Sequence, residues 1–522
     1  KPGHHPEDFF PAHEVGEGRP HHPQPAIIAP VIQATTLPLN PGQGTTVAIV
    51  GSALGERLQY HGEFEGAIQT AFPRAQLRVR NLASSGDTAG LRPHAGRATA
   101  WAFPGAAAFH ADHLAHRGEG HYPYPDEWLT IVGADVVLGF FGYSESFAGP
   151  DGNFQDELRA WIRHTRTRAY HGGIAPRIVL VSPIAFEDRS STDPLPNGIA
   201  ENVNLAAYTQ ALLAVAAAEQ VGAIDAFTPS QAWYAESSDY LTLNGCHLNQ
   251  AGYTRFSQFL ARSLFGQSAK PSRSLLAAIE EKNWLWDQDY RMPNGVHAFG
   301  RRWQPFGDFN YPEEFEKVRQ MTDLRDTAIW AAARGESVVI NDAITRPLTP
   351  VKTNFHRDIT YLPEPEVMAK FKVPEGFAIN LFADETLFPD LANPVQLTFD
   401  NRGRLWVAVM PSYPHYQPGG VVPNDKLIIL EDTDGDGRAD KQTTFADHLH
   451  LPIGFSIQPD GSVIVSQQPR LIRLVDTDGD DQADQREILL TGFDSHDTHH
   501  AIGAFTTGPT GDIYMLEGTF LH

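Results

Sequence analysis

Apolar runs alternate with helix-like stretches between residues 45 and 266, and this alternation restricts the fold more than any other feature of the chain. The helix-like stretches lie near 56–72, 154–169, 199–219 and 249–265. The apolar runs are typical of buried parallel strands: TVAIV (46–50), LRVRNL (77–82), DVVLGFF (135–141), RIVLVSP (177–183) and AIDAF (223–227). This order predicts an α/β fold, a three-layer sandwich in which helices cover both faces of a parallel sheet.

Four short segments fall at the carboxyl ends of these strands or on the loops that follow. They are VGSALGER (50–57), NLASSGDTAG (81–90), GFFGYSES (139–146) and NGCHLNQAGY (244–253). Open α/β sheets bind their ligands at the carboxyl ends of the strands. The sequence therefore predicts one site, assembled from these four segments.

In their order and spacing the four segments resemble the four blocks of the SGNH (GDSL) hydrolases. The resemblance implies hydrolysis of an ester. A serine attacks the carbonyl, a histidine takes the serine proton, an aspartate orients that histidine, and N–H groups hold the oxyanion. Gly86 matches the oxyanion glycine of the family, and His247 matches its base.

Three positions depart from the family pattern. With Gly51 and Leu54 aligned to the first block, Ala53 falls at the nucleophile and Ser52 one residue before it. Ser144 stands where the family has asparagine, and Asn244 stands where it has the orienting aspartate.

Two interpretations of these departures remain open. In the first, Ser52 is the nucleophile, His247 the base and Asn244 its orienting group, while Gly86 and Ser144 donate to the oxyanion. In the second, the domain keeps the fold and a cleft, and binds a carbohydrate or another small ester without hydrolysing it. The single cysteine, Cys246, lies beside His247, where a half-buried structural role is commoner than that of a nucleophile.

From about residue 371 the pattern changes to β-structure. Three segments share a strand–turn–strand template, with turn glycines at 403, 461 and 511: 397–409, 455–467 and 505–518. This spacing indicates the blades of an incomplete β-propeller over 371–522. We expect residues 267–370 to form a mixed connector with a helix near 312–334, and residues 1–44, rich in Pro and His, to form an extended tail.

Two acidic loops, DTDGDGRAD (432–440) and DTDGDDQAD (476–484), space their carboxylates as calcium loops do. The predicted ligands are Asp432, Asp434, Asp436 and Asp440 in the first loop, and Asp476, Asp478, Asp480, Asp484 and Glu487 in the second. Calcium would make this region a metal-stabilised structural module. The alternative is that the Asp-Gly pairs only form hairpin turns.

Three histidines gather in HDTHHAIGAF (496–505), just before a predicted strand. His496, His499 and His500 are therefore candidates for a metal site or for proton abstraction.

Residues 371–522 resemble the propeller of predicted membrane-bound dehydrogenases, and together with the segments ahead of them the chain looks like the front part of PVC-type haem-binding CxxCH proteins. The shared stretches include NPVQLTFDNRGRLWVAV, PSYPHY, KLIILEDTDGDGRADK, HDTHHA and EGTF. The resemblance implies that the front domain serves a quinoprotein-like, haem-linked sugar dehydrogenase, with His500 as the base and a redox partner for a longer parent protein. With one cysteine, this chain has no CxxCH haem attachment.

A net charge of −23 argues against nucleic acid as a partner, because phosphates need a positive surface. No stretch is apolar for long enough to span a membrane. The chain begins with Lys-Pro-Gly and stops soon after a strand-like run, so it looks processed or truncated. With this start, the family resemblance implies a fragment of an exported protein, periplasmic or extracellular.

Overall fold

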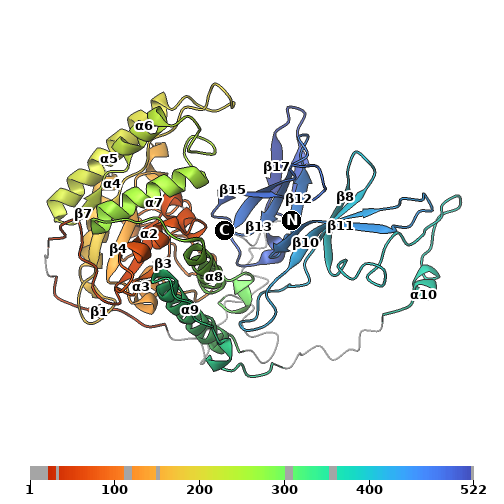
Figure 1. Ribbon diagram of the computed structural model, residues 1–522, viewed down its shortest axis with the longest axis horizontal. Helices are drawn as coiled ribbons and strands as arrows, with labels where there is room; N and C mark the ends of the chain where they lie inside the picture. Colours follow the sequence, from red (N-terminus) through yellow and green to blue (C-terminus); the bar gives the residue numbers. More distant parts are fainter. Residues whose placement is uncertain are drawn as a thin grey trace, which may run out of the picture. The chain divides into compact units, whose positions relative to one another are not determined.

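The computed structural model describes residues 22–30, 34–110, 120–148, 153–299, 310–351 and 361–518 (Figure 1). It divides into two compact units. The first comprises Lys1–Tyr290, Phe299–Arg301 and Pro312–Leu348, and the second Arg291–Ala298, Arg302–Tyr311 and Thr349–His522. In the part of the chain that the structure describes, no helix has the length and apolarity needed to cross a membrane.

A parallel five-stranded sheet forms the centre of the first unit, as the sequence predicts. Its strand order is β3-β2-β4-β6-β7, and every pair in it is parallel. The strands are β2 (Thr46–Gly51), β3 (Arg78–Asn81), β4 (Val136–Phe140), β6 (Arg177–Val181) and β7 (Gly222–Ile224). The side chains of β2 are buried throughout, which explains its apolar run.

Helices cover both faces of this sheet (Figure 1). α2 (Glu63–Ala71) and α7 (Gln250–Phe265) share one core cluster with Val47 and Ile49 of β2. On the other face, Trp161 of α4 (Asn153–Thr165) packs edge-on against Phe141, at 5.2 Å between ring centres. The remaining helices of the sandwich are α3 (Pro125–Val132), α5 (Ile199–Glu219) and α6 (Phe227–Glu236).

Two further helices, α8 (Arg273–Tyr290) and α9 (Tyr311–Ala333), come from the segment expected to be a connector and belong to the first unit, apart from Tyr311. Buried ion pairs join α8 to α2 and α9 to β3. Lys282 Nζ lies 2.7 Å from Glu65 Oε2 of α2, with only 2% and 5% of the two side chains exposed. Arg80 of β3 binds Asp326 of α9 at 2.6 Å. Buried charges are tolerated only when paired, so these helices complete the unit.

Part of the predicted tail packs against the first unit. β1 (Ala26–Ile27) pairs with β5 (Arg168–Ala169), and the buried Leu39 donates its N–H to the Leu264 carbonyl at 2.7 Å. The rest of the tail, residues 1–21 and 31–33, lies outside the described residues.

The second unit contains two four-stranded antiparallel sheets and a hairpin. The first sheet consists of β8 (Pro394–Phe399), β9 (Leu405–Val409), β10 (Asp425–Glu431) and β11 (Lys441–Leu449). The second consists of β12 (Gly454–Ile457), β13 (Val463–Gln467), β14 (Arg470–Val475) and β15 (Gln485–Thr491), and β16 (Ala504–Thr507) pairs with β17 (Ile513–Leu516). The three predicted turn glycines, 403, 461 and 511, have φ of +78°, +84° and +90°. Glycine adopts such angles without strain.

The first strands of successive sheets lie next to each other. Gln396 of β8 donates to the Phe455 carbonyl of β12 at 2.9 Å and accepts from its N–H at 2.7 Å. The described residues contain no closed ring of blades. Only the two four-stranded antiparallel sheets and the hairpin agree with the predicted propeller.

Candidate functional site

The predicted site segments do begin at one edge of the sheet. Gly51 of β2 lies opposite Phe140 of β4, and Ile49 lies opposite Asn81 of β3. Beyond the strands, Ser52 N–H donates to the Phe140 carbonyl and Ser84 N–H donates to the Gly51 carbonyl, both at 2.9 Å. The loops after β2, β3 and β4 therefore leave the sheet together at its carboxyl edge.

Ser52 directly precedes the short helix α1 (Ala53–Glu56), makes no side-chain capping hydrogen bond, and is only 1% exposed. Its neighbour Ala53, at the nucleophile position of the family pattern, is 4% exposed. Among the described residues, no hydrogen bond joins the Ser52 hydroxyl to His247. A local movement must therefore expose Ser52 before this hydroxyl can attack a substrate.

Asn244 orients His247. Its Oδ1 lies 3.1 Å from both the main-chain nitrogen and Nδ1 of His247. An amide oxygen only accepts hydrogen bonds, so Nδ1 carries the proton and the lone pair is on Nε2.

Burial, and secondarily the cationic Arg57, lowers the pKa of His247 to about 4, against a small opposing effect of Glu56. The imidazole is thus neutral near pH 7 and able to accept a proton. Burial raises the pKa of the neighbouring Cys246 thiol, whose sulfur lies 3.3 Å from His247 Nδ1. A protonated thiol is a poor nucleophile, which favours the structural interpretation of Cys246.

Gly86 presents its backbone to solvent. Its φ is +88°, a Cβ there would meet nothing within 4 Å, and no backbone hydrogen bond of the described residues uses its N–H. The loop is held by Glu56, whose Oε2 accepts from the N–H and the hydroxyl of Ser85 at 2.7 and 2.5 Å. The Gly86 N–H is therefore a fixed donor.

Ser144 begins the turn Ser144–Ala148, next to Tyr143. The Tyr143 ring meets the His247 ring edge-on at 6.2 Å between centres, which joins the third segment to the fourth. Gly142 N–H donates to Glu145 Oε2 at 2.8 Å, and burial raises the pKa of Glu145 to about 7.

Glu56, Arg57 and Tyr143 contact or influence the site but are not among the residues predicted from the sequence. All three lie inside the quoted segments. A charged pair soon after a fully buried strand would have pointed to Glu56 and Arg57, because fully buried charges are rare unless they are paired or functional. No comparable signal marks Tyr143.

The two acidic loops form matching strand–loop–strand turns in the second unit, between β10 and β11 and between β14 and β15. Asp432 Oδ2 accepts from Gly437 N–H at 2.8 Å, and Asp476 Oδ2 accepts from Asp481 N–H at 2.9 Å. The N–H of Gly435 and that of Gly479 each donate at 2.7 Å to the other carboxylate oxygen of the same aspartate.

The loops bring together only part of the predicted calcium ligands. In each loop three aspartates offer oxygens within 4.8 Å of one another: Asp432, Asp434 and Asp440, and Asp476, Asp478 and Asp484. Asp436 and Asp480 instead accept from the N–H two residues later. Glu487 lies on β15 opposite Arg473, outside its group of three.

In the histidine segment, the structure brings His499 and His500 together with the buried Asp497. His496 is 3% exposed and stands outside this group.

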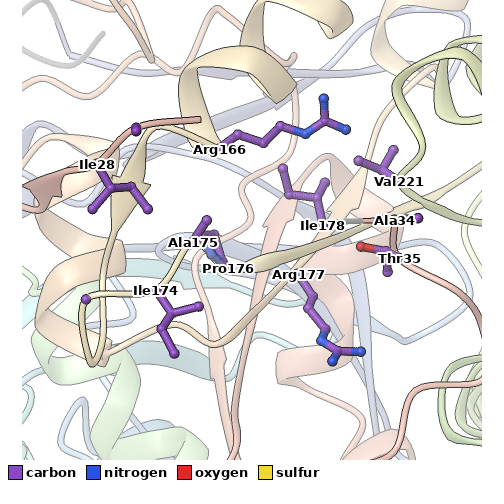
Figure 2. A pocket seen from close by; sticks show the side chains of 12 residues that line it. Ile28, Ala34, Thr35, Arg166, Ile174, Ala175, Pro176, Arg177, Ile178 and Val221 are labelled. Atoms are coloured by element: carbon purple, nitrogen blue, oxygen red, sulfur yellow. The ribbon is translucent and has the colours of Figure 1, made fainter. Parts of the chain in front are cut away.

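A pocket of about 340 Å³ lies elsewhere in the first unit (Figure 2). Arg177, the first residue of β6, is in its wall, so the pocket is at the amino end of that strand rather than at the carboxyl edge. Figure 2 shows Arg166 and Arg177 among apolar side chains such as Ile28 and Ile174. No predicted site residue lines it.

Comparisons with known proteins give one family and several solved structures. A domain of unknown function (DUF7133) matches residues 363–521, and no curated protein matches the chain. A gut microbial diltiazem-metabolizing enzyme, BT4096, is 14% identical with a TM-score of 0.30, over 44% of this chain and 48% of its own. The chain thus spans about half of that protein.

Two bacterial hydrolases are similar over nearly their whole length. A catalytic mutant of Axe2, an acetylxylan esterase from Geobacillus stearothermophilus, is 15% identical with a TM-score of 0.29, over 43% of this chain and 95% of its own. A lipase/acylhydrolase from Enterococcus faecalis is 14% identical with a TM-score of 0.28, over 44% and 99%.

Proposed function

We propose that the first unit is an ester hydrolase-like domain of the SGNH type that acts on a carbohydrate-type ester. One observation carries the proposal: Asn244 fixes a neutral His247 with Nδ1 protonated and the Nε2 lone pair available. A general base at neutral pH needs this protonation state.

In the proposed reaction, Ser52 Oγ attacks the ester carbonyl while His247 Nε2 takes its proton. The Gly86 N–H and the Ser144 hydroxyl donate to the oxyanion. The imidazolium then returns the proton to the leaving alcohol, and water releases the acyl group by the reverse sequence. Asn244 cannot stabilise the imidazolium as a carboxylate does. The comparable Asp-to-Asn change in a serine protease slows catalysis about 10⁴-fold, so we expect slow turnover.

Aromatic side chains beside His247 support a sugar substrate. Tyr143 packs edge-on against Phe147 at 5.4 Å between ring centres, and Phe147 is 78% exposed. An exposed aromatic ring beside a polar site offers a flat apolar surface, onto which a sugar ring can stack.

The test is hydrolysis of p-nitrophenyl acetate and of an acetylated oligosaccharide. Activity should vanish in Ser52→Ala and in His247→Ala and persist in Ser238→Ala and His171→Ala, which alter exposed residues. Phe147→Ala should raise KM for the oligosaccharide alone. Activity that survives both site variants would contradict the proposal.

A second candidate, a binding module without turnover, is favoured by the burial of Ser52. Calorimetric binding of an acetylated oligosaccharide that is never hydrolysed would identify it. In a longer parent protein, such a module would serve a quinone- and haem-dependent sugar dehydrogenase with its redox partner.

For the second unit we propose calcium in the two acidic loops. Exported proteins encounter enough calcium to fill weak sites, which accords with our proposal that the protein is exported.

A further inference from the structure

We propose that Asp497, His499 and His500 form a binding site for a divalent first-row transition-metal ion. All three belong to the second unit, so the inference is independent of the ester hydrolase proposal.

The three side chains converge on one point. One ligand atom from each lies within 4.8 Å of the other two. Asp497 Oδ1 is 3.0 Å from His499 Nδ1, and Asp497 Oδ2 is 3.9 Å from His500 Nε2. A metal about 2.0–2.2 Å from each nitrogen and oxygen donor fits between atoms spaced in this way, with adjustments of a few tenths of an ångström.

The site has a closed floor and an open side. Only 1% of the Asp497 side chain is exposed, whereas 34% of the His499 ring and 26% of the His500 ring are exposed. Three protein ligands with one side open to water is the arrangement of metal sites that keep a position for an exchangeable ligand.

The ligands stand on an anchored turn. Thr498–His500 form a short 3₁₀ helix in which His500 N–H donates to the Asp497 carbonyl at 2.9 Å. Asn294, which is 1% exposed, accepts from Thr498 N–H at 2.7 Å and donates its own N–H to the Thr498 hydroxyl at 3.0 Å. Fixed ligands bind a metal with less loss of conformational entropy.

The donor set selects the class of ion. Two imidazoles and one carboxylate suit zinc, cobalt, nickel or ferrous iron, whereas calcium and magnesium prefer oxygen alone. The two acidic loops, which offer only oxygen ligands, therefore favour calcium, whereas this site favours a transition-metal ion. A metal bound through Nδ1 takes the lone pair of a neutral His499 ring, whose single N–H proton then lies on Nε2, so His499 binds the ion without a net change in its protonation.

The test uses the full chain, stripped with a chelator and titrated with Co²⁺, whose visible absorption reports coordination by nitrogen ligands. We expect the wild type to bind one equivalent of Co²⁺ at this site. In His499→Ala and in His500→Ala, this binding should be lost or its affinity should fall about 100-fold or more. The expectation rests on the 10–100-fold loss that even outer-shell changes cause. His448→Ala, an exposed histidine of the same unit, should bind as the wild type does.

Binding of Co²⁺ by the other histidines of the chain is the same in the wild type, His499→Ala and His500→Ala. The difference in Co²⁺ binding between the wild type and these two variants therefore reports on this site alone. Melting temperatures measured without metal identify any variant that does not fold, and the two partly exposed histidines provide independent tests. Identical Co²⁺ stoichiometry and spectra in the wild type and in both folded variants would overturn the proposal. Asp497 and His499 would then be a carboxylate–imidazole pair suited to proton abstraction.

Discussion

Asn244 Oδ1 accepts hydrogen bonds from both the main chain and the ring of His247, at 3.1 Å each. Asn244→Asp keeps these acceptors and adds a charge that stabilises imidazolium. We expect ester hydrolysis to rise by up to about 10⁴-fold, the reverse of the loss seen in a serine protease. The measurement is kcat for p-nitrophenyl acetate. Asn249→Asp, the same change at the cap of α7, is the control and should leave kcat unaltered.

The pH dependence of hydrolysis should reflect the lowered pKa of His247. Because the ring is neutral above about pH 4, kcat/KM should stay level from pH 8 down to about 5 and fall through pH 4. Circular dichroism at each pH separates this limb from acid unfolding. An acid limb near pH 6.5, the ordinary value for histidine, would contradict the lowered pKa of His247.

Asp481 occupies the turn position that Gly437 holds in the first acidic loop, with φ of +63° against +89°. Its carboxylate accepts from both terminal nitrogens of Arg404, at 2.8 and 3.1 Å. Asp481→Ala and Asp481→Gly both lose this pair, but only glycine relieves the left-handed backbone. Urea unfolding should therefore find the Gly variant about 1 kcal/mol more stable than the Ala variant. Equal stabilities would contradict this reasoning.

Calcium should stabilise the second unit through the paired acidic loops. If each site has the roughly 10⁻⁴–10⁻³ M affinity of extracellular modules, about 10 mM Ca²⁺ adds on the order of 1–3 kcal/mol per site. The melting temperature should then rise by several degrees, and this rise should be absent in the Asp432→Asn/Asp476→Asn double variant. Asp447→Asn, which changes a half-exposed carboxylate outside both loops, is the control. No shift with either calcium or chelator would favour the turn-only interpretation.

His450 should make the second unit less stable in acid. Burial, with the cationic Arg470 and His415 nearby, lowers its pKa to about 3. Between pH 6.5 and 3 the unfolded chain takes up a proton there that the folded chain does not. The free energy of unfolding therefore falls by up to about 1.4 kcal/mol per pH unit as the pH drops.

His450→Gln removes this contribution, so its stability should decline less steeply with acid than that of the wild type. Denaturant unfolding at several pH values measures the slope. The exposed His448→Gln should retain the wild-type slope; a wild-type slope in His450→Gln as well would assign the acid sensitivity to other groups.

The architecture could be predicted where local pattern decides it. The five apolar runs became the five parallel strands, because each is buried on both faces. The helix expected near 312–334 is α9, at Tyr311–Ala333. The packing of α9 against β3 could not be predicted. It depends on the pairing of Arg80 with Asp326, which lie 246 positions apart, and a local hydrophobic pattern carries no information on so distant a contact.

The placement of three of the four segments was predictable, because parallel strands end together and the loops after β2, β3 and β4 begin at one edge. His247 follows no strand of this sheet directly, and its ring contact with Tyr143 could not be predicted from the strand pattern. The burial of Ser52 depends on how α1 packs, which its residue type does not reveal. Likewise, position 12 of a calcium loop predicts Glu487 as a ligand, but the pairing of β15 with β14 places it opposite Arg473.

The contact between Lys282 and Glu65 determines where this polypeptide can be shortened. A fragment ending at residue 266, the apparent end of the hydrolase-like pattern, would retain Glu65 without its buried counter-charge and leave one edge of the sheet uncovered. A fragment extending to residue 348 would keep both helices and their ion pairs. The smallest autonomous piece of the front half is therefore larger than its recognisable motifs suggest.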